Sequence, residues 1–201
     1  MAGKTEQPGD WSPCVVIADA GYVDKVAFDL TVNFERMLGR RVPKADLPRW
    51  AECAAMDGGL RPGGGGALVA LVHSGESECM ENFAPGNYVE EISGKAFRGP
   101  LGEFEFAAAP SPVSVSETMA DIAAEAAARE EVERIIVAPD TADGEGLARI
   151  VRALKKADRS KDITLLSMEP VAGCTLRQEI LGYSLLQALG ISGEELDKTL
   201  E

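Results

Sequence analysis

Residues 132–170 constrain the fold more than any other part of this chain. They begin with a short β-branched run at residues 134–138, which leads into an acidic, glycine-containing turn at residues 139–146. Apolar residues then recur at helical spacing, and a second apolar run begins at Ile163. Strand, turn, helix and strand in this order form a βαβ unit, so the two strands are expected to be parallel.

The same alternation of apolar runs and amphipathic segments extends over the rest of the chain. We predict strands at residues 14–18, 67–72, 102–107, 134–138 and 163–167. We predict helices at residues 22–38, 46–57, 114–129, 147–154, 175–189 and 192–200. This order indicates a three-layer α/β sandwich around a mainly parallel sheet of about five strands. Residues 13–201 are expected to form one domain, and residues 1–12 a flexible tail.

Composition and charge limit the possible functions. The formal net charge of -13 disfavours binding to nucleic acid, because such a field repels phosphate backbones. No apolar run approaches the roughly 18 residues of a membrane span, and the N-terminus lacks the apolar core of a signal peptide. By elimination we expect a cytoplasmic protein. The sequence does not identify its partner; the candidates are another protein and a second copy of the chain.

Four other features have a structural interpretation beside a functional one. The four cysteines are too scattered for a zinc site and are expected to be buried thiols. The glycines at residues 63–66 precede a strand, whereas phosphate-binding glycines follow one, so they predict a turn. His73 ends a strand and is expected to be a polar edge residue. A basic patch balances nearby acids or contacts phosphate; it comprises Arg36, Arg40, Arg41, Lys44 and Arg49.

Acidic residues follow two of the predicted strands. Asp19 ends the first strand, and Asp140-Thr141-Ala142-Asp143 follows the fourth and leads into a helix. Asp121 lies inside the helix that precedes the fourth strand. This order resembles the PIN-like superfamily, especially its NYN-type nuclease domains. Two features depart from that pattern: Tyr22 stands where those domains have an asparagine, and the turn at Asp140 is longer and lacks their phenylalanine.

The resemblance implies metal-dependent hydrolysis of RNA. Asp19, Asp121, Asp140 and Asp143 would be the catalytic acids, and the first three would hold Mg²⁺ or Mn²⁺, with Asp143 or Glu145 as an outer ligand. Hard divalent cations prefer oxygen ligands, and the metal would activate a water and neutralise charge on the phosphate. The alternative is structural: Asp143 caps a helix, and Asp19 only terminates a strand.

A second resemblance is carried by three sequence runs. The runs NFERMLGR, AMDGGL and FRGPLGEFEF, at residues 33–40, 55–60 and 97–106, are similar to an uncharacterised family of Bacteroidota proteins. That resemblance implies no activity.

Three hypotheses about function remain open. The first is a Mg/Mn-dependent ribonuclease that uses the carboxylates at the strand ends. The second is a degenerate PIN/NYN-like fold that acts in binding or interaction, which the net charge and Tyr22 favour. The third is a phosphate- or nucleotide-binding domain with Gly144 and Gly146 at a helix N-terminus. A separate packing prediction is that Leu181, Leu185 and Leu189 are buried, because their spacing places them on one helix face.

Overall fold

The computed structural model describes residues 11–200, and the side chains of residues 11–197. Most of the predicted N-terminal tail, residues 1–10, lies outside the described residues. Trp11 is described, and it packs against the hydrophobic cluster that contains β1 and α3. The guanidinium carbon of Arg129 lies 5.7 Å from the centroid of the Trp11 ring.

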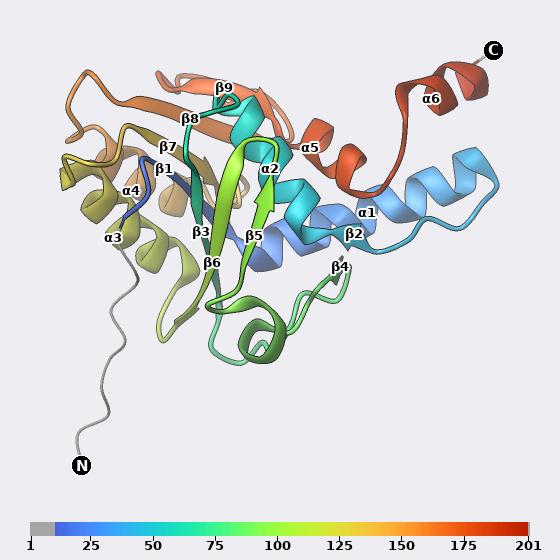
Figure 1. Ribbon diagram of the computed structural model, residues 1–201, viewed down its shortest axis with the longest axis horizontal. Helices are drawn as coiled ribbons and strands as arrows, with labels where there is room; N and C mark the ends of the chain where they lie inside the picture. Colours follow the sequence, from blue (N-terminus) through green and yellow to red (C-terminus); the bar gives the residue numbers. More distant parts are fainter. Residues whose placement is uncertain (1–10, 201) are drawn as a thin grey trace.

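The centre of the molecule is a seven-stranded sheet in the order β5-β6-β3-β1-β7-β8-β9 (Figure 1). Its strands are β1 (Cys14–Asp19), β3 (Gly66–Ser74), β5 (Ala96–Gly99), β6 (Gly102–Ser111), β7 (Arg134–Ala138), β8 (Asp162–Ser167) and β9 (Arg177–Ile180). Neighbouring strands are parallel except for β5 and β6, which are antiparallel. The predicted mainly parallel sheet is therefore confirmed, and the five predicted strands lie side by side with β1 in the interior.

The sheet has two strands more than predicted, one at each edge. β5 forms a short hairpin with β6, and β9 pairs with β8. The segment that contains β9 was expected to start a helix, and that prediction is wrong. Gln178 lies in β9 and exchanges side-chain hydrogen bonds with the backbone of Val171, at 2.7 Å and 3.3 Å.

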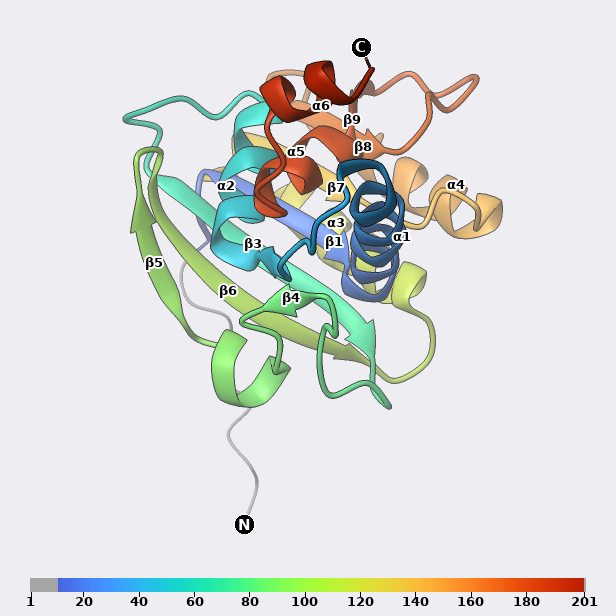
Figure 2. The ribbon, with the colours of Figure 1, turned by 90° about the vertical axis from the view of Figure 1, so that its right-hand side faces the viewer.

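Helices cover both faces of the sheet (Figure 2). One face packs against α1 (Ala20–Leu38), α2 (Leu47–Asp57) and α5 (Leu181–Ala188). The other packs against α3 (Val115–Ala128) and α4 (Gly144–Leu154). α6 (Gly193–Leu200) lies beside α1, and Arg40 pairs with Glu195 at 2.9 Å. The smaller elements are β2 (Ala45–Asp46), β4 (Phe83–Ala84) and the single π-turn η1 (Tyr88–Ile92).

Local sequence signals explain where most of these helices begin and end. Asp46 caps α2 through the backbone N–H of Arg49, at 2.9 Å, and Gly39 closes α1 with φ 65°. Ser114 and Glu117 have the spacing of a capping box, but Ser114, the N-cap of α3, makes no side-chain capping hydrogen bond. Leu181, Leu185 and Leu189 are fully buried, which confirms that packing prediction.

The order of the parallel strands creates one special position. The chain goes outward from β1 through β3 to β6, then crosses the sheet and goes outward again through β7, β8 and β9. The strand order therefore reverses between β1 and β7. Open α/β sheets bind ligands beyond the carboxyl ends of their strands at such a switch point. A ligand site is therefore expected at the carboxyl ends of β1 and β7.

Candidate functional site

A small pocket of about 130 Å³ lies at the carboxyl ends of β1 and β7. Its walls come from the end of β1, the start of α3 and the turn between β7 and α4. Its polar lining residues are Asp19, Ser114, Ser116, Asp140 and Asp143. The structure thus brings together three of the four acids that the sequence indicated.

Asp19 ends β1 and also caps α1. Its Oδ1 accepts a hydrogen bond from the backbone N–H of Tyr22, at 2.9 Å. Burial raises the pKa of the Asp19 carboxyl above its ordinary value, while the Tyr22 N–H opposes that rise. The carboxylates of Asp140 and Asp143 raise the Asp19 pKa further, so the three acids interact electrostatically.

Asp140 and Asp143 bind backbone N–H groups of their own turn. Asp140 Oδ1 accepts from the N–H of Ala142, and Asp143 Oδ1 accepts from the N–H of Gly146, each at 2.9 Å. Asp143 is the N-cap of α4, so its predicted capping role is confirmed. Together with Asp19, all three carboxylates use one oxygen to hold the local backbone.

Asp121 lies apart from these acids. It is exposed on α3 and does not line the pocket. The first turn of α3 instead presents Glu117, which forms an ion pair with Arg149 of α4. The hydrogen bond to Glu117 raises the pKa of Arg149, and Glu145 and Asp143 add to the effect. No signal in the sequence indicated this pair, because Glu117 and Arg149 lie on different helices and only tertiary packing brings them together.

The donor set does not fit a metal ion in this arrangement. Within the described residues, no group of three or more His, Cys, Asp or Glu side chains is placed to hold one. Asp19, Asp121 and Asp140, which the resemblance implied as ligands, do not form such a group.

Gly144 and Gly146 open α4, as the nucleotide-binding hypothesis required. The N–H of Gly146 is already bound to the carboxylate of Asp143. A Cβ added at Gly146 would collide with Asp143 and Ser116, so the space around this glycine is filled. A phosphate group at this helix N-terminus would meet the Asp143 carboxylate, which repels it.

Tyr22 lies near the same acids. Burial raises the pKa of its phenol, a hydrogen bond with Thr141 opposes the rise, and the charges of Asp140 and Asp19 add to it. Its ring is half-buried.

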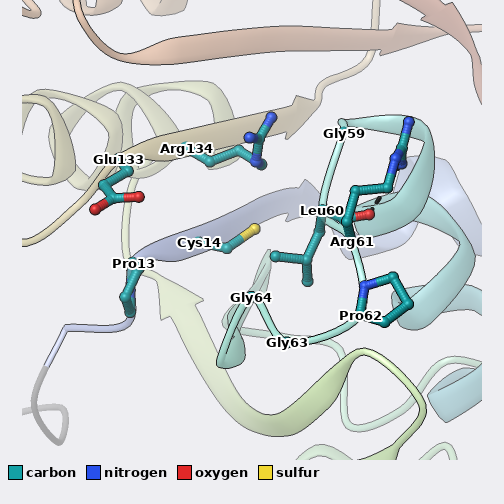
Figure 3. Close-up of a pocket in the computed structure, with 10 residues that line it drawn as sticks. All are labelled: Pro13, Cys14, Gly59, Leu60, Arg61, Pro62, Gly63, Gly64, Glu133 and Arg134. Carbon is teal, nitrogen blue, oxygen red and sulfur yellow. Dashed lines mark hydrogen bonds between the residues drawn. The ribbon is translucent and has the colours of Figure 1, made fainter.

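A second pocket, of about 350 Å³, lies at the amino ends of β1 and β7 (Figure 3). Two arginines line it, but their guanidinium groups bind the protein itself. Arg134 donates to the carbonyl of Gly58 at 2.7 Å and pairs with Asp162 at 2.9 Å. Arg61 donates to two backbone carbonyls of the neighbouring turn, each at 2.9 Å. Burial raises the pKa of the Cys14 thiol to about 12, which makes it unreactive.

The outcomes for the remaining predicted features are mixed. The glycines at residues 63–66 form the turn into β3, as predicted. Cys14 and Cys53 are buried, but Cys79 and Cys174 are partly exposed, so the prediction of buried thiols holds for only two. His73 is buried rather than at an edge: its ring stacks on Tyr88 with centroids 3.8 Å apart.

Three of the five residues of the basic patch form ion pairs with nearby acids, which agrees with its structural interpretation. Arg40, Arg41 and Arg49 form ion pairs with Glu195, Glu35 and Glu52.

Comparison with known proteins gives one match. A model of a family of unknown function (DUF6621) matches residues 9–196. The chain belongs to this family. The predicted resemblance to an uncharacterised family is thereby confirmed, while the assignment of that family to Bacteroidota stays a prediction. No curated protein and no solved structure matches the chain.

Membership of DUF6621 brings no activity with it, so any function has to be argued from geometry. Among the described residues, none of the helices is long and apolar enough to cross a membrane.

Proposed function

We propose that this member of DUF6621 is a degenerate PIN/NYN-like domain that acts in binding or interaction and does not cleave RNA. The observation that carries the proposal is the use of its acids. Asp19, Asp140 and Asp143 share one pocket, but each binds a backbone N–H, and Asp121 is exposed on α3 outside that pocket.

Charge supports the same proposal. A nuclease has to draw a phosphate backbone to its acids, and this requires basic groups around the site. Arg149, on the helix beside the pocket, is paired with Glu117 and lies 3.9 Å from Glu145. Its charge is balanced locally, and the net charge of the chain is -13.

The metal-dependent ribonuclease is the second candidate. It is favoured by the charge coupling of the pocket, since Asp140 and Asp143 both raise the pKa of Asp19. A bound cation would reduce the electrostatic repulsion between these carboxylates. Small rotations of the three side chains would be needed to free both oxygens of each for a metal.

A titration with Mn²⁺ distinguishes the two candidates. A working site, at a metal concentration 100-fold above its Kd, stabilises the fold by about 2.7 kcal/mol. In a chain of this size, that raises the Tm by about 5–10 °C. We expect a much smaller change, equal in the wild type and in Asp19→Asn, and no cleavage of a fluorescently labelled single-stranded RNA.

Asp19→Asn is a suitable variant because asparagine also caps helices, so α1 keeps its cap. Mn²⁺-dependent cleavage that disappears in Asp19→Asn would refute the proposal and establish the nuclease. A large Mn²⁺ stabilisation without cleavage would show that the pocket binds metal as a non-catalytic site.

A further inference from the structure

A larger apolar pocket lies away from the carboxyl edge of the sheet, between α2, α5 and α6. Its volume is about 520 Å³, which falls within the range of small-molecule sites. Apolar side chains from all three helices and the α5–α6 connection line it, and among them are Met56, Leu186, Ile191 and Leu196. Tyr183 and Met56 stand at its walls with 66% and 46% of their surfaces exposed.

Among the residues whose side chains the structure describes, Asp57, the last residue of α2, is the only charged residue that lines this pocket. Its Oδ2 is buried and has no hydrogen-bond partner. None of the ion pairs among the described residues involves its carboxylate. A buried carboxylate oxygen without a partner costs free energy, because the protein does not replace the water that it has lost.

The two arginines near Asp57 are bound elsewhere. Arg177 pairs with Glu179 at 2.8 Å and donates to the backbone carbonyl of Asp57 at 3.0 Å, not to its carboxylate. Arg61 donates to the backbone carbonyls of Met56 and Leu60. The carboxylate also stands at the C-terminus of α2, where the helix dipole is negative and disfavours an anion.

Together, the unpartnered carboxylate oxygen and the apolar walls suit a cation with an apolar attachment. We propose that the pocket between α2, α5 and α6 binds a small organic cation, with an ammonium or guanidinium group against Asp57 and an apolar body against Met56, Leu186 and Ile191. A charge-assisted hydrogen bond to the carboxylate and burial of the apolar body would both contribute to affinity.

The pocket between α2, α5 and α6 suits the apolar part of such a ligand better than the adjoining pocket does. The adjoining pocket, of about 550 Å³, shares Met56 and Asp57 but is also lined by Arg61, Arg177 and Glu179. Its guanidinium groups would repel a second cation and leave no continuous apolar wall. The proposal concerns a different part of the molecule from the pocket between β1 and β7, and it does not rest on the function proposed above.

The pH dependence gives a second readout. The pKa of the Asp57 carboxyl is raised to about 6, first by burial and then by Glu179, while Arg177 and Arg61 lower it. Cys53 of α2 and Tyr183 of α5 also line the pocket. Because the ligand binds the ionised carboxylate, affinity should fall about tenfold when the pH is lowered from one unit above this pKa to one unit below it.

The test is an NMR titration of the ¹⁵N-labelled full chain at neutral pH with two probes of equal length, n-hexylamine and n-hexanol. The amine is protonated at this pH and the alcohol is neutral. We expect n-hexylamine to shift the amide signals of α2, α5 and α6, and to bind at least tenfold more tightly than n-hexanol. Asp57→Asn should remove that preference, and Asp29→Asn, which neutralises an exposed acid of α1, should retain it.

A third probe, N-acetyl-lysine methylamide, identifies the source of the cation. Tighter binding of this probe than of n-hexylamine assigns the site to a lysine side chain, and weaker binding assigns it to a free amine. The spectrum of each variant reports directly whether it is folded. Equal affinity for amine and alcohol, unchanged amine binding in Asp57→Asn, or shifts confined to other elements would overturn the proposal. Absence of n-hexylamine binding would also overturn it.

Discussion

Replacing Asp57 with asparagine is expected to stabilise the protein at neutral pH, although it removes a native charge. The physical reason lies in the surroundings of the carboxylate. Burial and the nearby Glu179 disfavour its charged form, and its Oδ2 has no hydrogen-bond partner. Asparagine has nearly the same shape but no charge, so it avoids most of the cost of burial.

The magnitude follows from the change in pKa. Folding raises the pKa of Asp57 from 3.8 to about 6. Each pKa unit corresponds to about 1.36 kcal/mol, so the full difference would be about 3 kcal/mol. Asp57 is partly exposed to solvent. Water therefore screens its charge, and this reduces the expected gain to about 1–2 kcal/mol. In a chain of this size the Tm should rise by about 2–8 °C.

The sign of the pH dependence is fixed as well. Between pH 4 and pH 6 the folded state binds the proton of Asp57 more strongly than the unfolded state does. The contribution of Asp57 to the stability of the wild type should therefore fall as the pH rises through this window. The advantage of Asp57→Asn should be near zero below it and constant above it. Asp19 also has a raised pKa, but it is present in both proteins and cancels in the difference.

Urea unfolding of the wild type, Asp57→Asn and Asp29→Asn across this pH range measures the effect. Asp29 is an exposed acid on α1, so its replacement controls for the change in net charge. A destabilised Asp57→Asn at neutral pH would show that the carboxylate is paired in solution, with Arg61 or Arg177. A gain that does not vary with pH would show that it has another cause than the titration of Asp57.

Three further predictions concern packing, capping and backbone geometry, and each is measured by chemical unfolding. Leu185→Ala should cost about 2–5 kcal/mol, because Leu185 is fully buried; no loss would mean that α5 does not pack as described. Asp143→Ala should cost about 1 kcal/mol through the lost cap of α4, and Asp143→Asn much less; equal losses would deny the capping role. Gly66→Ala should reduce the free energy of unfolding more than Gly63→Ala does. Both glycines have a positive φ, but only at Gly66 does a new Cβ collide with the backbone of Glu103. Similar losses of stability in the two variants would contradict this crowding.

The sequence predicted the central sheet well, because its inner strands are continuous apolar runs. Residues 14–18 and 134–138 have no other stable location than between two helical layers. The edge strands carried no such signal. β9 reads Arg-Gln-Glu-Ile, and only its pairing with β8 makes it a strand. Its one polar signal, the spacing of Thr175 and Gln178, equally suits a helix cap.

The candidate site was predicted in part for a related reason. Asp19, Asp140 and Asp143 follow parallel strands, and the ends of neighbouring parallel strands meet at one edge, so their shared pocket follows from topology. Whether Asp121 reaches the same pocket depends on the direction in which its position on α3 faces. Met119 and Ala123 face the sheet, and a residue midway between them faces away. That spacing was readable in the sequence and would have placed Asp121 outside the site.

The environment of Asp57 could not be predicted from the spacing of residues in the sequence. In the sequence it is an ordinary acid before two glycines at a helix end. Its environment is created by α5 and α6, which are far from it along the chain and carry the apolar side chains that line its pocket. Desolvation of a charge is a property of tertiary packing and not of the local sequence.

The two groups of carboxylates therefore differ in what they do for the folded chain. Asp19, Asp140 and Asp143 repel one another, but each binds a backbone N–H of its own turn, so all three have a structural reason to be there. Asp57 has no such partner and lies at the unfavourable end of a helix dipole. A charge that destabilises the protein alone persists most simply when something outside the chain compensates it. The stability gain and the loss of amine binding expected for Asp57→Asn test the two halves of this argument separately, since the first measures the cost and the second measures its compensation.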